Sequence, residues 1–266
     1  MAPVANSTSD AARTSASHSV NPTAQRHEDF QTIRVASDRL HYSDEYITAQ
    51  YEYLNTHVER KMDLQGEELV ATPYKQEFEF RTSRKVPKTG LMLVGLGGNN
   101  GTTISATILA NRHNIQWHNK DGLQVPNYYG SLVRASTIRL GSDASTGKDV
   151  WVPFSNVLPM VHPNDLVIGG WDISSLPMDE AMARAKVLDY DLQRQLTPYM
   201  AEIKPLPSVY YPDFIASNQE ERADNVIPGQ EKKAHVEHLR NDIRQFKSQH
   251  GLDQVIVVWT ANTERY

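Results

Sequence analysis

The chain has 266 residues and a formal net charge of −5, with lysine and arginine scattered along it. It therefore lacks the basic surface that nucleic-acid binding needs, and nucleic acid is not expected as a partner. No apolar run approaches the roughly 20 residues of a membrane span, and without cysteine there is no disulfide framework. We expect a soluble, cytoplasmic chain that contacts no membrane.

The first 27 residues are rich in serine, threonine, alanine and asparagine and contain few large apolar side chains. Such a composition cannot bury enough apolar surface to offset the entropy of ordering the chain. We expect a disordered tail over residues 1–27.

Residues 28–88 carry aromatic side chains among charged ones, and the alternation is strongest from Tyr74 to Phe80. An alternation of period two is typical of short, half-buried strands. We expect a strand-rich N-terminal extension over residues 28–88 that packs on the main domain. Pro87 and Gly90 mark the boundary, and the main domain covers residues 89–266.

The stretch LMLVGLGGNNGTT, from Leu91 to Thr103, has the pattern of a dinucleotide-phosphate site. Its four apolar residues predict a buried parallel strand, and the glycines permit a sharp turn that brings backbone N–H groups to a pyrophosphate. A helix from about Gly101 to Arg112 would direct its positive dipole end at the phosphates. Because Asn100 stands where the G-x-G-x-x-G fingerprint has its third glycine, a tight turn without a ligand is the alternative.

Residues His113–Ser155 are polar and rich in glycine, proline and asparagine, which predicts a long irregular insertion. Within it, Gly141–Lys148 is superficially similar to a phosphate-binding P-loop. The spacing is one residue too long, and Asp149 stands where a magnesium-binding hydroxyl is needed. A P-loop is therefore rejected.

Strands and helices alternate through the rest of the chain. Apolar runs predict the strands, and the amphipathic stretches between them predict the helices. This alternation is typical of an α/β fold with a Rossmann-like, doubly wound and mostly parallel sheet. The expected elements are a strand at Asp165–Asp172, a helix at Met178–Met200, a strand at Ser208–Tyr211, a short helical turn at Asn218–Ala223, a helix at Gln230–Gln249 and a strand at Val255–Trp259.

Small or polar residues stand at the carboxyl ends of the predicted strands, where open α/β sheets bind their ligands. Asp172 is suited to accept hydrogen bonds from ribose hydroxyls, or equally to cap the turn that follows it. Thr260, Asn262 and Thr263 are suited to contact a phosphate or a nicotinamide amide, although Asn262 is equally suited to a left-handed turn.

The residues predict no catalytic or metal-binding set. His235 and His238 have the helical spacing of a metal pair, but without a third ligand they favour a solvated helix face. Paired acids such as Asp189 and Asp191 favour surface charge, and the sequence contains no nucleophile elbow.

Four strings resemble the eukaryotic myo-inositol-1-phosphate synthase (inositol-3-phosphate synthase) family. They are GLGGNNGTT at Gly95–Thr103, VIGGWDISS at Val167–Ser175, YYPDFIASNQEERADN at Tyr210–Asn225 and WTANTER at Trp259–Arg265. Their length and order make the resemblance specific, and it covers about Phe30 to Tyr266. The family's own GGNNG turn also explains the departure from the dinucleotide fingerprint.

The resemblance implies NAD as the cofactor, and the matching positions imply its contacts. At the pyrophosphate these are Gly98, Asn99, Asn100 and Gly101, and at the adenosine ribose Asp172. The adenosine side is lined by Ser208, Val209, Gln219 and Arg222, and the end of the last strand supplies Thr260, Ala261, Asn262 and Thr263. For Arg222, a salt bridge with Glu220 or Glu221 is the alternative.

The resemblance also implies conversion of D-glucose 6-phosphate to 1D-myo-inositol 3-phosphate by a homotetramer, in inositol and phospholipid biosynthesis. Oxidation, enolisation, aldol cyclisation and reduction follow one another with no net redox change. Family members are much longer and carry their catalytic lysines in a second half, so no catalytic residue is assigned here. We expect an NAD-binding half that is inactive alone, incomplete at its C-terminus, with apolar surface exposed. The alternative is a non-catalytic, truncated module that binds NAD or assembles with full-length subunits.

Overall fold

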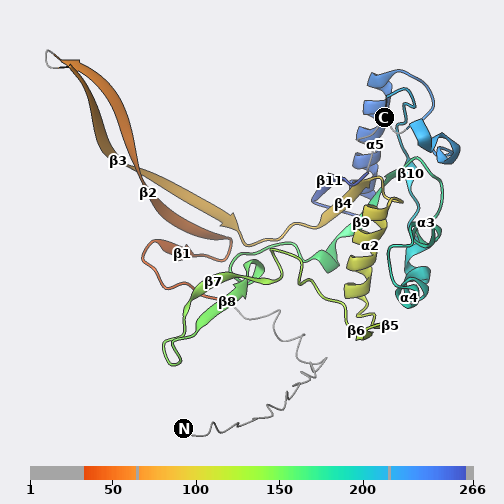
Figure 1. Cartoon of the computed structure of the whole chain (residues 1–266), viewed down its shortest axis with the longest axis horizontal. Helices are drawn as coiled ribbons and strands as arrows, with labels where there is room; N and C mark the ends of the chain where they lie inside the picture. Colours follow the sequence, from red (N-terminus) through yellow and green to blue (C-terminus); the bar gives the residue numbers. More distant parts are fainter. Residues whose placement is uncertain (1–32, 64–65, 215–216, 262–266) are drawn as a thin grey trace, which may run out of the picture.

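The computed structural model describes residues 33–63, 66–214 and 217–261 (Figure 1). The expected tail over residues 1–27 and the expected contacts Asn262 and Thr263 lie outside the described residues. Within the described ranges, the strands form one four-stranded sheet, one three-stranded sheet and two two-stranded hairpins.

The four-stranded sheet is parallel throughout and consists of β4 (Thr89–Val94), β9 (Val167–Asp172), β10 (Leu206–Pro207) and β11 (Gln254–Trp259). Its strand order is β10-β9-β4-β11. From β4 the chain adds β9 and β10 on one side and then returns to add β11 on the other. The order therefore reverses between β4 and β11, and sheets of this kind bind ligands at the carboxyl edge beside the reversal.

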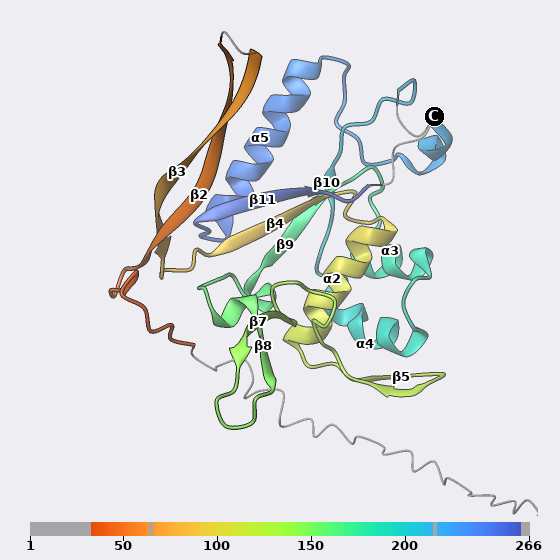
Figure 2. The same ribbon diagram turned by 60° about the vertical axis from the view of Figure 1, so that its left-hand side comes forward.

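Helices cover both faces of this sheet (Figure 2). They are α2 (Asn99–Arg112), α3 (Met178–Ala185), α4 (Tyr190–Met200) and α5 (Lys232–Gln249). Leu93 of β4 packs with residues of α2, α3 and α4, whereas its neighbour Met92 packs with Phe246 of α5. Successive strand residues point to opposite faces, so β4 contributes to both cores. The predicted doubly wound α/β fold is confirmed.

The expected helix Met178–Met200 is in fact two helices, α3 and α4. They are separated at Lys186, which has a left-handed backbone conformation with φ 53°. Both helices bury apolar residues on one side, so the amphipathic pattern runs through the break. A lysine gives no sequence signal for a left-handed residue, which glycine or asparagine usually supplies. The break allows α3 and α4 to contact each other while both contact α2.

The expected strand at Ser208–Tyr211 is also corrected. The strand in this place is the two-residue β10, and Ser208 forms only an isolated bridge with Val226. Pro207 has no N–H group to donate, which limits the pairing at this edge. The short helical turn lies at Ser217–Arg222, close to its expected position.

The N-terminal extension consists of β1 (Leu40–Tyr42), β2 (Tyr46–Asp63) and β3 (Gly66–Ser83). β2 and β3 pair antiparallel along their whole length, and most of their described side chains are exposed. Figure 1 shows this hairpin projecting away from the parallel sheet. The prediction of short, half-buried strands is therefore wrong. The division into an extension (28–88) and a main domain (89–266) stays a prediction.

The aromatic alternation in this hairpin separates two exposed faces. On one face Tyr51, Phe78 and Phe80 cluster with ring centroids 6.3–6.5 Å apart. On the other, Lys75 forms ion pairs with Glu52 and Glu77. A period of two therefore predicts the strands correctly but does not show whether either face is covered.

The expected irregular insertion at His113–Ser155 contains two hairpins, β5 (Trp117–Asn119) with β6 (Gly122–Gln124) and β7 (Ser136–Ser142) with β8 (Asp149–Pro153). These strands are short and mostly exposed, so their alternation gives a weak signal. The segment rejected as a P-loop consists of the end of β7 and the turn between β7 and β8. In this turn, hydrogen bonds from Ser145 and Thr146 lower the pKa of Asp143 to about 2.

Candidate cofactor-binding site

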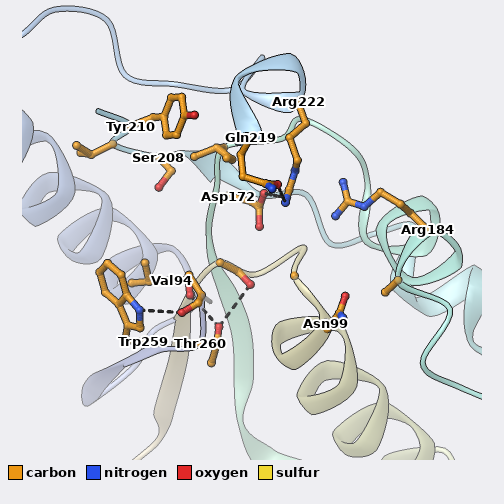
Figure 3. Close-up of a pocket in the computed structure, with 16 residues that line it drawn as sticks. Val94, Asn99, Asp172, Arg184, Ser208, Tyr210, Gln219, Arg222, Trp259 and Thr260 are labelled. Carbon is orange, nitrogen blue, oxygen red and sulfur yellow. Dashed lines mark hydrogen bonds and ion pairs between the residues drawn. The ribbon is translucent and has the colours of Figure 1, made fainter. Parts of the chain in front are cut away.

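A cavity of about 340 Å³ opens at the carboxyl edge of the parallel sheet (Figure 3). It lies beyond the ends of β4, β9 and β11, beside the point where the strand order reverses. The segment after β10 and the last turn of α3 complete its wall. Of the residues predicted to contact a cofactor, the cavity is lined by Gly98, Asn99, Asp172, Ser208, Val209, Gln219, Arg222, Thr260 and Ala261.

The turn between β4 and α2 depends on close approaches of the backbone. Gly95 has φ +84°, and a Cβ there would lie 2.7 Å from the Cβ of Ala261. A Cβ on Gly101 would lie 2.2 Å from the carbonyl oxygen of Leu96. Neither position therefore accepts a side chain without movement of the backbone. Gly101 and Asn100 lie in the first turn of α2 rather than on the cavity wall.

The N-terminus of α2 is suited to hold an anion. Its N-cap residue, Gly98, contributes no side-chain cap, and its first turn carries no acidic residue. Such a helix end presents backbone N–H groups and a partial positive charge. Gly98 itself has an ordinary backbone conformation with φ −75°, and only one heavy atom, the Gly95 carbonyl oxygen at 3.2 Å, would lie near an added Cβ. The missing side chain thus leaves space on the cavity wall.

Asp172 connects the end of β9 to the glycine turn. It is 3% exposed, and its Oδ2 accepts a hydrogen bond from the Gly97 N–H at 2.9 Å. Its Oδ1 accepts hydrogen bonds from the Ser174 N–H at 3.0 Å and from Arg222 Nη2 at 2.9 Å. The capping interaction expected as an alternative is therefore present. A carboxylate has about four acceptor positions, so one remains for a ribose hydroxyl.

Arg222 approaches Asp172 from the segment after β10. Its Nη1 donates to Gln219 Oε1 at 2.9 Å, and its ion pair is with Asp172 rather than with Glu220 or Glu221. Its Nε is buried and has no hydrogen-bond partner among the described residues. Leaving a buried donor unsatisfied costs about 1–3 kcal/mol, so a ligand acceptor in this position would stabilise the site.

Thr260 fixes the end of β11 against the glycine turn. Its backbone N–H and its Oγ1 both donate to the Val94 carbonyl oxygen, at 2.9 and 2.8 Å. Asn100 Nδ2 in turn donates to the Thr260 carbonyl oxygen at 3.1 Å. Thr260 therefore lines the cavity, but its hydroxyl proton is donated to Val94. Asn100 supports this part of the wall through its hydrogen bond to the Thr260 carbonyl oxygen.

Seven further residues of the wall were not among the predicted contacts, and three of them, Arg184, Tyr210 and Trp259, have large side chains with polar groups. Tyr210 and Trp259 belong to strings that carry the family resemblance, so a sequence signal existed for them. Arg184 has no such signal, because a single arginine on the exposed side of a helix has the pattern of an ordinary surface residue. Its Nη2 donates to the Gly97 carbonyl oxygen at 2.7 Å.

The two histidines of α5 do not form a metal site, and the described residues contain no cluster suited to one. His235 is buried and hydrogen-bonded to the hydroxyl of Tyr211 at 2.7 Å, so the prediction of a solvated face is wrong for it. His238 is exposed, and its Nε2 lies 3.7 Å from Asp242 Oδ1. The prediction of a solvated face is therefore correct for His238.

These features together define a Rossmann-type dinucleotide-binding domain: a glycine turn that begins a helix, a carboxylate at the end of the second strand and a reversal of strand order. The wall also fits NAD, because Gly98 leaves a space that a Cβ would fill and Arg222 Nε lacks an acceptor. Among the described residues, no helix is long and apolar enough to cross a bilayer.

Comparisons with known proteins agree with this class and narrow it. A family model described as myo-inositol-1-phosphate synthase matches residues 89–266. Inositol-3-phosphate synthase of Dictyostelium discoideum is 51% identical over 237 residues, which are 89% of this chain and 45% of that protein. Human inositol-3-phosphate synthase 1 is 56% identical over 232 residues, 87% of this chain and 40% of that protein.

A solved structure supports the same assignment. The crystal structure of inositol-3-phosphate synthase from Caenorhabditis elegans matches with a TM-score of 0.81 and 48% identity, over 89% of this chain and 45% of that one. The chain belongs to the myo-inositol-1-phosphate synthase family, and the cofactor of its domain is NAD. It spans less than half the length of the relatives that it matches.

Proposed function

We propose that this chain is the NAD-binding half of an inositol-3-phosphate synthase, which isomerises D-glucose 6-phosphate to 1D-myo-inositol 3-phosphate in inositol and phospholipid biosynthesis. One observation carries the proposal: the GGNNG turn, the Asp172–Arg222 pair and the end of β11 meet at one cavity in a chain of this family. The intact enzyme would be a cytoplasmic homotetramer.

The predicted contacts, most of which line the cavity, would bind and orient the cofactor. Gly98, Asn99, Asn100 and Gly101 form the pyrophosphate turn, and Asp172 accepts a hydrogen bond from the adenosine ribose. The adenosine side is formed by Ser208, Val209, Gln219 and Arg222, and the end of β11 contributes Thr260, Ala261, Asn262 and Thr263. Bound NAD⁺ would supply a reversible hydride acceptor, so that the reaction has no net redox change.

The remaining chemistry needs groups that we do not assign to this chain. An enolate and an aldol oxyanion are stabilised by positioned cations or hydrogen-bond donors. Of the cationic side chains on the described cavity wall, Arg222 pairs with Asp172 at the proposed ribose position, and Arg184 is hydrogen-bonded to Gly97 of the glycine turn. We therefore assign no catalytic residue and expect the chain to be inactive alone, with the catalytic lysines in the part that its relatives have in addition.

Two measurements on the 266-residue chain test this proposal. Calorimetric titration with NAD⁺ should show binding, and an assay for inositol phosphate from glucose 6-phosphate should show no product. A full-length synthase serves as the positive control for both. Failure to bind NAD⁺ would contradict the cofactor site, and turnover by the chain alone would contradict its dependence on a second half.

A second candidate, a truncated module that assembles with full-length subunits, is favoured by the exposed apolar side chains Ile256, Val257 and Trp259 on β11. The mass of the protein in its native source separates the two. A mass near 30.0 kDa would favour the module. A clearly larger species containing this sequence would favour the half-enzyme.

A further inference from the structure

Arg184 joins α3 to the glycine turn at the rim of the cavity. It stands in the last turn of α3, and its Nη2 donates to the carbonyl oxygen of Gly97 at 2.7 Å. Gly97 directly precedes Gly98, the N-cap of α2. In Figure 3 the guanidinium of Arg184 points from α3 toward Asp172 and Arg222. The side chain thus reaches from an exposed helix face into the place where the turn meets the ribose position.

The charges on the cavity wall do not balance. Its charged side chains are one carboxylate, Asp172, and two guanidinium groups, Arg184 and Arg222. Asp172 already pairs with Arg222 at 2.9 Å, and Arg184 has no ion pair among the described residues. Desolvation and then the nearby charge of Arg222 lower the pKa of Arg184, although Asp172 partly opposes this. The wall therefore carries one positive charge in excess, beside the positive end of α2.

A simpler reading is that Arg184 is a helix C-terminal cation, which the dipole of α3 favours by a few tenths of a kcal/mol. That role requires only that the charge lie near the last turn of α3. It does not require the side chain to cross to the Gly97 carbonyl group or to approach a second arginine. A charge-assisted hydrogen bond to the glycine turn indicates a role at that turn.

We propose that Arg184 is a further cofactor-binding residue, which holds the glycine turn through Gly97 and offers its cation to the phosphates of the dinucleotide. This inference rests on the proposed NAD site. The phosphates are the part of the ligand that carries negative charge, and the turn that Arg184 holds is the one expected to bind them. Nε and Nη1 of Arg184 remain as donors, since its hydrogen bond to Gly97 uses Nη2.

The test compares ligands with and without phosphate. Arg184→Met, which keeps the aliphatic stem, should weaken NAD⁺ binding roughly ten-fold, the loss typical of one charge-assisted hydrogen bond. Binding of adenosine, followed by NMR titration because its affinity is low, should stay within about two-fold. Arg184→Lys should recover part of the NAD⁺ affinity. Arg194→Met on α4 is the matched control, since Arg194 is exposed and pairs with Asp191 away from the cavity.

Three results would overturn the inference. Unchanged NAD⁺ affinity in Arg184→Met would show that the cation does not serve the cofactor. An equal loss for NAD⁺ and adenosine would show a purely structural role. If the unsubstituted chain binds no NAD⁺, the proposed function fails and this inference fails with it. If the unsubstituted chain binds NAD⁺ and only the Arg184→Met result is contrary, this inference alone fails. The two failures are therefore distinguishable.

Discussion

Asp172 is the residue at which the glycine turn, the second strand and the segment after β10 meet. Its carboxylate receives the Gly97 N–H, the Ser174 N–H and the guanidinium of Arg222. A buried carboxylate is expensive unless such donors surround it, so these contacts also explain why the residue can be buried. The strand pattern and the resemblance predicted a ribose contact here. Neither predicted the bond to Gly97, because 75 positions of sequence separate the two residues.

The substitution Asp172→Asn tests this role. It removes the charge opposite Arg222 and places an amide N–H₂ group where one of three donors now points. We expect the free energy of unfolding to fall by about 2 kcal/mol, less than for a fully buried pair because Arg222 is partly exposed. NAD⁺ affinity should fall as well.

Urea unfolding and calorimetric titration measure the two effects. The control is Asp149→Asn, which breaks an exposed pair with Arg139 and should leave the free energy of unfolding nearly unchanged. Equal stability of Asp172→Asn and the unsubstituted chain would contradict the role given to this carboxylate.

At the scale of elements, α5 packs on the sheet through the aromatic ring of Phe246. Phe246 lies over two glycines of neighbouring strands, since a Cβ on Gly90 or on Gly169 would come within 2.8 and 2.7 Å of its ring atoms. Two strands without side chains at these positions thus form a depression for the ring. Phe246 packs there with Met92, Trp171 and Leu252.

Phe246→Ala should lower the free energy of unfolding by about 3 kcal/mol, because it leaves a cavity above the two glycines. NAD⁺ affinity of the folded protein should be unchanged, since α5 covers the sheet face and not its carboxyl edge. Val236→Ala on the same helix is the control, because Val236 is 47% exposed. A loss of stability no larger than that of the control would contradict this packing.

The sequence correctly predicts those strands and helices whose signal lies within a few neighbouring residues. β4, β9, β11, α2 and α5 follow from apolar runs or from amphipathic spacing, and all were placed within a few residues. The break between α3 and α4 was missed because both helices share one pattern and Lys186 is no usual helix terminator. The extent of the β2–β3 hairpin was missed because strand pairing is decided between distant residues, and the exposed fraction of a strand face does not appear in its alternation.

For the site, much of the prediction came from the resemblance, and the residue pattern alone supplied the glycine turn, Asp172 and the polar ends of the strands. Arg184 was missed because a single arginine on an exposed helix face looks like surface. Only the folded chain brings it to Gly97, which lies 87 positions away in sequence.

At the scale of the whole molecule, the exposed apolar side chains of the described residues include the aromatic face around Tyr51, Phe78 and Phe80, and Ile256, Val257 and Trp259 of β11. Exposed apolar surface was expected from the resemblance, and β11 confirms it. The described residues already bring the glycine turn, the end of β9 and the end of β11 together at one cavity. We therefore predict that cofactor binding, unlike turnover, is a property of this chain by itself.

The measurement that tests this claim most directly is NAD⁺ binding by the chain and by Gly98→Val. Gly98 has φ −75°, and an added Cβ would have one close neighbour, the Gly95 carbonyl oxygen at 3.2 Å, so with a shift of a few tenths of an ångström there the variant should fold with unchanged circular dichroism. Its side chain would occupy the proposed pyrophosphate position, and NAD⁺ binding should be abolished. Gly130→Val, where no heavy atom lies within 4 Å of an added Cβ, is the control and should bind normally. A folded Gly98→Val chain that binds NAD⁺ with full affinity would contradict the placement of the cofactor in this cavity.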